Sequence, residues 1–142
     1  MTRFVTDSGR SAQTFEMRRF RGTVVLAMAF TLFALNALAQ VALVLVGRSD
    51  DPAALSLLQV AIGLTSLAAA RGSWTGARWA PVAALLYGLS TATMLVALGP
   101  LLELPADARG GLWVGAAAVQ AFGLGAAWYL RRARRQATTT GA

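Results

Sequence analysis

The residues best suited to chemistry in this sequence are amides and hydroxyls that lie within long uncharged stretches. Asn36 and Gln40 are four residues apart, so they share one face of a helix. Similar stretches further along the chain hold Gln59, Ser90, Thr91 and Gln120. These six residues are compatible with a polar track for a small solute, with the four amides as its lining. Hydrogen bonds between packed helices are the favoured alternative, because this is the more frequent use of such side chains in membranes.

Several kinds of catalysis lack the residues that they need. The chain has no His and no Cys, and its 13 basic residues are all arginine. A thiol nucleophile, a lysine Schiff base and the commonest metal ligands are therefore excluded. The acids Asp50, Asp51, Glu103 and Asp107 do not have the spacing of a cation-binding loop. We expect a non-enzymatic protein with no catalytic residue, no metal site and no cofactor.

The uncharged stretches have the length of membrane-spanning helices. They cover residues 23–47, 53–70, 79–102 and 110–130. A helix needs about 20 apolar residues to cross the hydrocarbon core of a bilayer. In this chain 56% of the residues are apolar and only 13% are charged. The stretches do not alternate in polarity as the strands of a membrane barrel do. The sequence therefore predicts an all-α fold, an integral membrane four-helix bundle.

Short connections separate the four predicted helices, so consecutive helices are expected to be antiparallel neighbours in an up-down arrangement. The chain divides into an N-terminal segment (1–22), a transmembrane domain (23–130) and a basic tail (131–142). Part of the N-terminal segment, 12–21, has the pattern of a helix that lies at the membrane surface.

The arginines predict the direction in which the chain crosses the membrane. With four crossings, every arginine except Arg48 and Arg109 falls on the side of the two termini. Basic residues in short loops stay in the cytoplasm, so both termini are expected to be cytoplasmic. Trp74, Trp79 and Trp128 fall at the same boundary, which aromatic rings prefer. The predicted location is the bacterial cytoplasmic (cell inner) membrane, with multiple passes.

Two arginine clusters flank the predicted transmembrane domain. Their members are Arg18, Arg19, Arg21, Arg131, Arg132, Arg134 and Arg135. Such clusters attract anionic lipids at the cytoplasmic face of a bilayer. They account for most of the net charge of +7, so the charge reflects topology and no nucleic-acid partner is expected.

Small residues recur four positions apart in the predicted helices. Ala84 and Gly88 form such a pair in the third stretch, and Ala121 and Gly125 form one in the fourth. Spacing of this kind lets helix backbones approach closely. The contact lies either within the chain, or with a membrane-protein partner or a second copy in a homo-oligomer.

These patterns favour an accessory or scaffolding subunit of a membrane assembly. The alternatives are a small-solute channel or carrier lined by Asn36, Gln40, Gln59 and Gln120, and a binder of lipids or other hydrophobic ligands. Convergence of the four amides on one cavity favours transport, whereas their dispersal among helix contacts favours packing.

Overall fold

The computed structural model describes residues 8–47 and 53–140, and describes side chains for 21–47 and 53–136. The described chain consists of α1 (Ser8–Leu45), α2 (Ala53–Thr75), α3 (Ala80–Leu101) and α4 (Ala106–Thr140). Each helix contains a segment long and apolar enough to span a membrane, and these are Arg21–Leu45, Ala53–Thr75, Ala80–Leu101 and Ala106–Gln136. The prediction of an all-helical chain with four such segments is confirmed.

Helix ends follow the glycines and prolines of the sequence. Gly76 has a φ of 66°, in the left-handed region that glycine adopts readily, and it follows the last residue of α2. The N–H of Ala77 then donates to the carbonyl of Gly72 at 3.0 Å, which closes the end of the helix. Pro81 lies in the first turn of α3, where its missing N–H is not needed. At the other end, α3 stops at Leu101, directly after Pro100.

The helices extend beyond the uncharged stretches of the sequence. The predicted surface segment 12–21 belongs to α1, which runs as one helix from Ser8 to Leu45. Similarly, α2 continues past Arg71 to Thr75, and α4 includes the arginines that follow Leu130. The charge-free length reflects the thickness of the hydrocarbon core, and a helix does not have to end where its residues reach water.

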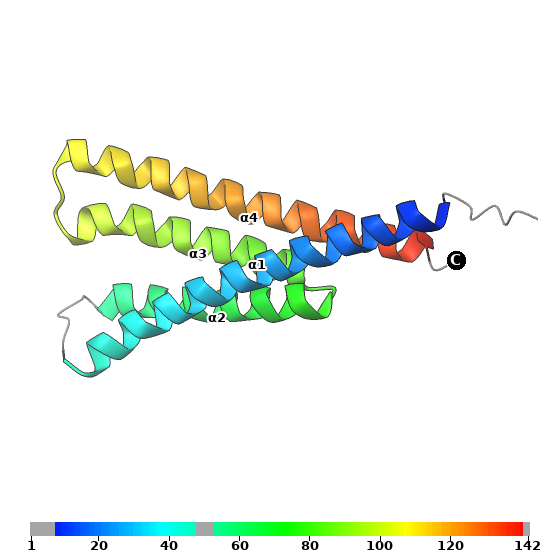
Figure 1. Cartoon of the computed structure of the whole chain (residues 1–142). Helices are drawn as coiled ribbons and strands as arrows, with labels where there is room; N and C mark the ends of the chain where they lie inside the picture. The colour runs from blue at the N-terminus through cyan, green and yellow to red at the C-terminus, as the bar shows by residue number, and fades with distance from the viewer. Residues whose placement is uncertain (1–7, 48–52, 141–142) are drawn as a thin grey trace, which may run out of the picture.

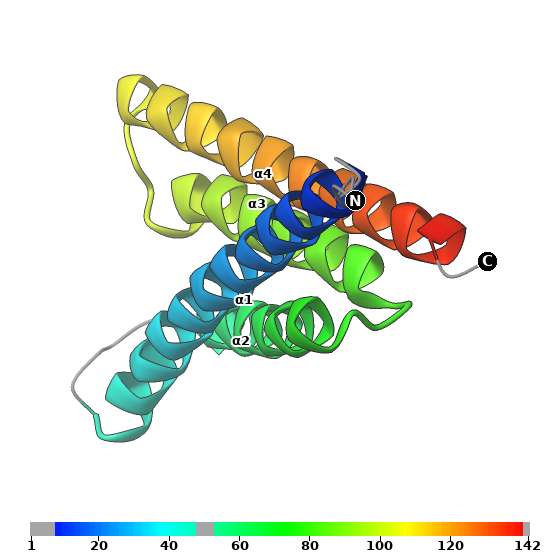
Figure 2. The same ribbon diagram turned by 45° about the vertical axis from the view of Figure 1, so that its right-hand side comes forward.

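The four helices form two packed pairs, α1 with α2 and α3 with α4, which are joined through contacts between α2 and α3. Contacts between α1 and α4 are few, so the bundle is open on that side. Figure 2 shows α1 crossing the other helices obliquely. In Figure 1 the beginning of α1, the α2–α3 connection and the end of α4 lie at one end of the molecule.

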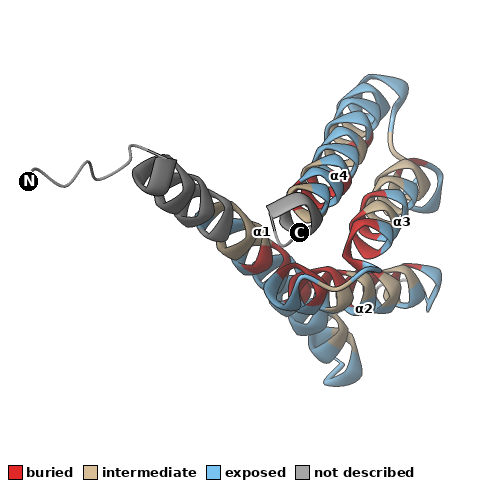
Figure 3. Cartoon of the chain, turned by 90° about the vertical axis from the view of Figure 1, so that its right-hand side faces the viewer, coloured by how far each residue is buried: buried red, intermediate tan, exposed pale blue. Residues whose placement is uncertain are grey.

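Small side chains dominate the packed interior. Most of the buried apolar residues are alanines, while leucines such as Leu32, Leu57 and Leu64 are more than half exposed. Figure 3 shows the buried residues where the helices meet and the exposed residues around the outside. An apolar exterior of this extent is unusual in water but is the normal exterior of a protein surrounded by lipid.

The backbones of α3 and α4 approach each other closely at two glycines. A Cβ atom on Gly123 would lie 3.0 Å from the carbonyl oxygen of Ala84 and 3.1 Å from the Cα of Gly88. Gly88 therefore takes part in a close contact, as its spacing predicts, but its partner is Gly123. Gly125 has open space around its Cβ position.

Replacing Gly123 with leucine should therefore destabilise the pairing of α3 with α4. The new side chain meets backbone atoms that cannot rotate away, and overpacking of this kind costs about 1–3 kcal/mol. Unfolding of the purified chain in mild detergent, followed by circular dichroism during heating or denaturant titration, measures the effect. The control is Gly125→Leu, which adds the same side chain to the same helix. It should leave the stability unchanged, because the space around the Cβ position of Gly125 is open. Equal stability of both variants would contradict the glycine contact.

Candidate functional site

Two of the amides, Asn36 and Gln40, lie on the outside of α1. Both side chains are exposed, and neither forms a hydrogen bond to any other described residue. The buried face of the same helix is formed by Ala27, Phe30, Ala34 and Ala37. Asn36 therefore faces away from the packed interior of this chain.

Asn36 belongs to a continuous stripe along the outer face of α1. Val25, Leu32, Asn36 and Leu43 follow one another at intervals of seven, four and seven residues, which places them in line on a helix. The three apolar members are 64%, 67% and 41% exposed. This α1 stripe (Val25, Leu32, Asn36 and Leu43) has the pattern of a helix face that packs against another helix, with one amide in its middle.

The remaining polar residues lie within the molecule, and they are divided among different helices. Gln59 is buried on α2, and its Oε1 has no hydrogen-bond partner among the described residues. The Oε1 of Gln120 on α4 is also buried without such a partner, and it lies beside Gly88. The hydroxyl of Thr91 on α3 is likewise buried and has no hydrogen-bond partner among the described residues. The hydroxyl of Ser90, in contrast, donates a hydrogen bond to the carbonyl of Leu86 at 2.8 Å. Asn36 and Gln40 are exposed, Gln59 is buried and Gln120 is half-buried, so the four amides do not share one environment.

An aromatic cluster connects the two helix pairs near their middle. Phe30 and Phe33 on α1 contact Tyr87 on α3, with both ring centroids 5.3 Å from that of the tyrosine. Phe122 on α4 completes the cluster, 5.7 Å from Phe30. Sequence analysis missed this cluster. The available signal was the spacing of Phe30 and Phe33, which places two rings on adjacent positions of one helix face.

Most of the described arginines lie at the end of the molecule that holds the α2–α3 connection. The guanidinium of Arg134 on α4 donates to the carbonyl of Arg78 at 3.4 Å. Tyr129 on the same helix fills the space where Gly22 of α1 has no side chain. Arg132 lies over the ring of Trp128, with 5.3 Å between the guanidinium carbon and the ring centroid.

Among the arginines of the two predicted clusters, four are exposed, namely Arg21, Arg131, Arg132 and Arg135. Arg18 and Arg19 belong to α1, but their side chains lie outside the described residues.

The acids with described side chains lie at the opposite end. Glu103 and Asp107 flank the α3–α4 connection, where the Arg109 side chain donates to the carbonyl of Leu104 at 2.8 Å. Asp50 and Asp51 lie outside the described residues. Within residues 8–47 and 53–140, no group of three acidic side chains is arranged to hold a metal ion.

Two of the surface pockets on the described helices are relevant to binding. One, of about 550 Å³, lies between α3 and α4, and its lining is almost entirely apolar. Its lining residues are Ala92, Thr93, Val96, Ala97, Pro100, Trp113, Ala116 and Ala117. The other, of about 540 Å³, lies at the basic end, beside the α2–α3 connection. None of the four amides lines either pocket.

The polar side chains described above can bind a ligand or a partner through amide, hydroxyl and guanidinium groups. Comparison of the chain with protein-family models, with curated proteins and with solved structures finds no match.

Proposed function

We propose that this protein is a non-enzymatic accessory or scaffolding subunit of a membrane assembly, and that the α1 stripe is the face that contacts its partner. The exposure of Asn36 in the middle of a span carries the proposal. Asn36 is nine residues from Leu45, or about 14 Å at 1.5 Å per residue, which places its amide well inside the hydrocarbon core. An amide in hydrocarbon without a hydrogen-bond partner is strongly unfavourable.

A partner helix along the stripe removes this penalty. It offers a side chain or carbonyl to Asn36, and it packs against Val25, Leu32 and Leu43 through shape complementarity. Gln40 lies one turn beyond Asn36 and adds a second amide to the same contact. Exposed alanines on α1, such as Ala39, have small side chains. They allow the partner helix to approach α1 closely.

The orientation that we propose places the basic end of the molecule in the cytoplasm and the α3–α4 connection outside. The contact of Arg134 with Arg78 supports it, because both belong to the arginine-rich side of the predicted topology. The partners at that face are anionic lipids, and the membrane is the cytoplasmic membrane of a bacterium.

Single cysteines test this orientation, because the chain has none of its own. A membrane-impermeant maleimide applied to intact cells should label Ala106→Cys at the start of α4. The same reagent should label Thr75→Cys at the end of α2 only after lysis. Labelling of Thr75→Cys in intact cells, with Ala106→Cys protected, would reverse the orientation.

Replacement of Asn36 and Gln40 together by leucine should weaken the assembly while leaving the fold of the chain intact. Hydrogen bonds between membrane helices contribute about 0.6 kcal/mol each, so loss of two weakens association roughly fivefold to tenfold. Native electrophoresis of membranes solubilised in mild detergent measures the fraction of chain in the larger species. The control is Ser90→Ala, which removes only a hydroxyl bonded within its own helix.

A photoreactive amino acid then tests which face makes the contact. Placed at Leu32 in the stripe, it should cross-link to protein in intact membranes. Placed at Leu64 on α2, which is 61% exposed, it should react mainly with lipid. A chain that migrates only as a monomer and cross-links equally from both positions would refute the proposed role.

A second candidate function is the binding of a hydrophobic ligand, and the pocket between α3 and α4 favours it. Its apolar walls and the Trp113 ring at its edge suit an acyl chain or a similar molecule. The dispersed amides give the third alternative, a solute channel or carrier, no comparable support within a single chain.

Filling this pocket with Ala97→Phe should reduce saturable binding of a brominated fatty acid several-fold, because the new ring occupies the space that the acyl chain needs. Quenching of tryptophan fluorescence in the purified chain measures the binding. Ala118→Phe adds the same ring to an exposed position of α4 that does not line the pocket. Equal quenching in the wild type and both variants would exclude a specific ligand.

A further inference from the structure

We infer that the pocket at the basic end binds the phosphate group of an anionic phospholipid, with Arg71 and Trp79 as the recognising side chains. The pocket is lined by Leu67, Ala68, Arg71, Thr75, Ala77 and Trp79. This inference requires that the helices span a bilayer, but it does not depend on any protein partner or on the α1 stripe.

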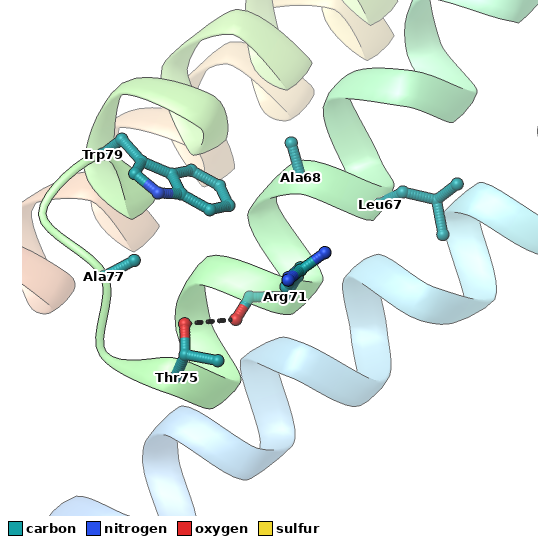
Figure 4. A pocket seen from close by; sticks show the side chains of 6 residues that line it. All are labelled: Leu67, Ala68, Arg71, Thr75, Ala77 and Trp79. Atoms are coloured by element: carbon teal, nitrogen blue, oxygen red, sulfur yellow. Dashed lines mark hydrogen bonds between the residues drawn. The ribbon is translucent and has the colours of Figure 1, made fainter.

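The pocket is formed by the last turns of α2 and the chain that leads into α3. Figure 4 shows Arg71 projecting from α2 and Trp79 lining the pocket from the start of α3, with the end of the Arg71 side chain directed away from the ring. Gly72 fixes the position of this ring, because a Cβ atom there would lie only 2.9 Å from Cζ3 of Trp79. The indole therefore rests directly on the α2 backbone, next to Arg71.

The electrostatic environment favours an anion. The Arg71 side chain is exposed and forms no ion pair or hydrogen bond with the described part of the chain. Arg78 precedes Trp79, and the guanidinium of Arg134 is held against the Arg78 carbonyl. The acidic side chains that the structure describes, Glu103 and Asp107, lie at the other end of the molecule. Among the described side chains, Arg71 therefore has no acidic partner, and its fork of donors has a geometry that suits phosphate oxygens.

The start of α3 adds the partial positive charge of a helix N-terminus but no free backbone donor. The N–H groups of Ala80, Val82 and Ala83 already donate to the carbonyls of Ala77 and Trp79, and Pro81 has no N–H. The Thr75 hydroxyl donates to the carbonyl of Arg71 at 2.9 Å, so its proton is already used. The polar donors left for a ligand are the guanidinium of Arg71 and the indole N–H of Trp79.

The lining distinguishes a lipid from free phosphate. Leu67 and Ala68 lie one turn of α2 before Arg71, on the side of the membrane interior, and they give the pocket an apolar extension. A volume of about 540 Å³ exceeds what a phosphate ion fills and accommodates a headgroup with the beginning of its acyl chains. Arginine and tryptophan at the level of the headgroups, above apolar side chains, match the two chemistries of a phospholipid.

Native mass spectrometry of the full chain tests the inference. The protein is exchanged into equal amounts of phosphatidylglycerol and phosphatidylcholine, and the bound lipids are counted for the wild type, Arg71→Gln and Trp79→Leu. Arg71→Gln should lower the ratio of bound phosphatidylglycerol to phosphatidylcholine roughly fivefold, the effect expected for one arginine near an anionic lipid. Arg71→Lys should retain part of the preference, because the charge remains while the fork of donors is lost. Melting temperatures of all variants verify that they are folded.

Arg132→Gln is the matched control, since it removes an equal charge from α4, where Arg132 stacks on Trp128 outside the pocket. If Arg132→Gln lowers the ratio as strongly as Arg71→Gln, the attraction is diffuse and the site is refuted. A further arm adds inorganic phosphate to the wild type before the lipid exchange. Displacement of phosphatidylglycerol by millimolar phosphate would show that the pocket recognises the free anion, and would overturn the assignment to a lipid.

Discussion

Close contact between helix backbones is the interaction on which this structure depends. In hydrocarbon, burying a leucine against another helix gives little advantage over leaving it in lipid, so pairing relies on dense packing. The glycine contact of Gly88 with Gly123 provides such packing between α3 and α4. Alanines fulfil the same role between α1 and α2, where Gly63 faces Ala37 and Leu38. The large apolar side chains are correspondingly directed outward.

The aromatic cluster has a different role, because it holds the two pairs together where α1 and α4 make few other contacts. Phe30 meets Tyr87 edge to face at an interplanar angle of 82°, whereas Phe33 stacks on Tyr87 at 21°, and ring quadrupoles favour both edge-to-face and offset-stacked pairs. Tyr87 is buried while Phe33 and Phe122 reach the surface. The cluster thus closes the middle of the molecule and leaves α1 free to present its outer face.

The sequence predicted those features that the bilayer itself imposes. The lengths of the uncharged stretches predicted the four membrane-spanning segments, because any charge in hydrocarbon is penalised regardless of its neighbours. Gly76 and Pro100 marked helix ends for local backbone reasons. The partner of Gly88 was not predictable, because Gly111, Gly115, Gly123 and Gly125 are equally small and only the rotation of α4 selects among them. For the same reason, sequence could not tell that Asn36 faces outward while Gln120 faces Gly88.

The exclusive use of arginine at the basic end has a consequence for regulation. A guanidinium remains protonated at any physiological pH, and lysine acetylation has no target in this chain. With no histidine present either, the positive charge facing the membrane surface does not vary with acidification of the cell. Ionic strength remains the variable that weakens its attraction to lipid, through screening over about 8 Å at physiological salt. In the proposed orientation, the end that contains Arg78 and Arg134 is thus a permanent anchor whose strength is set by the salt and the lipid composition around it.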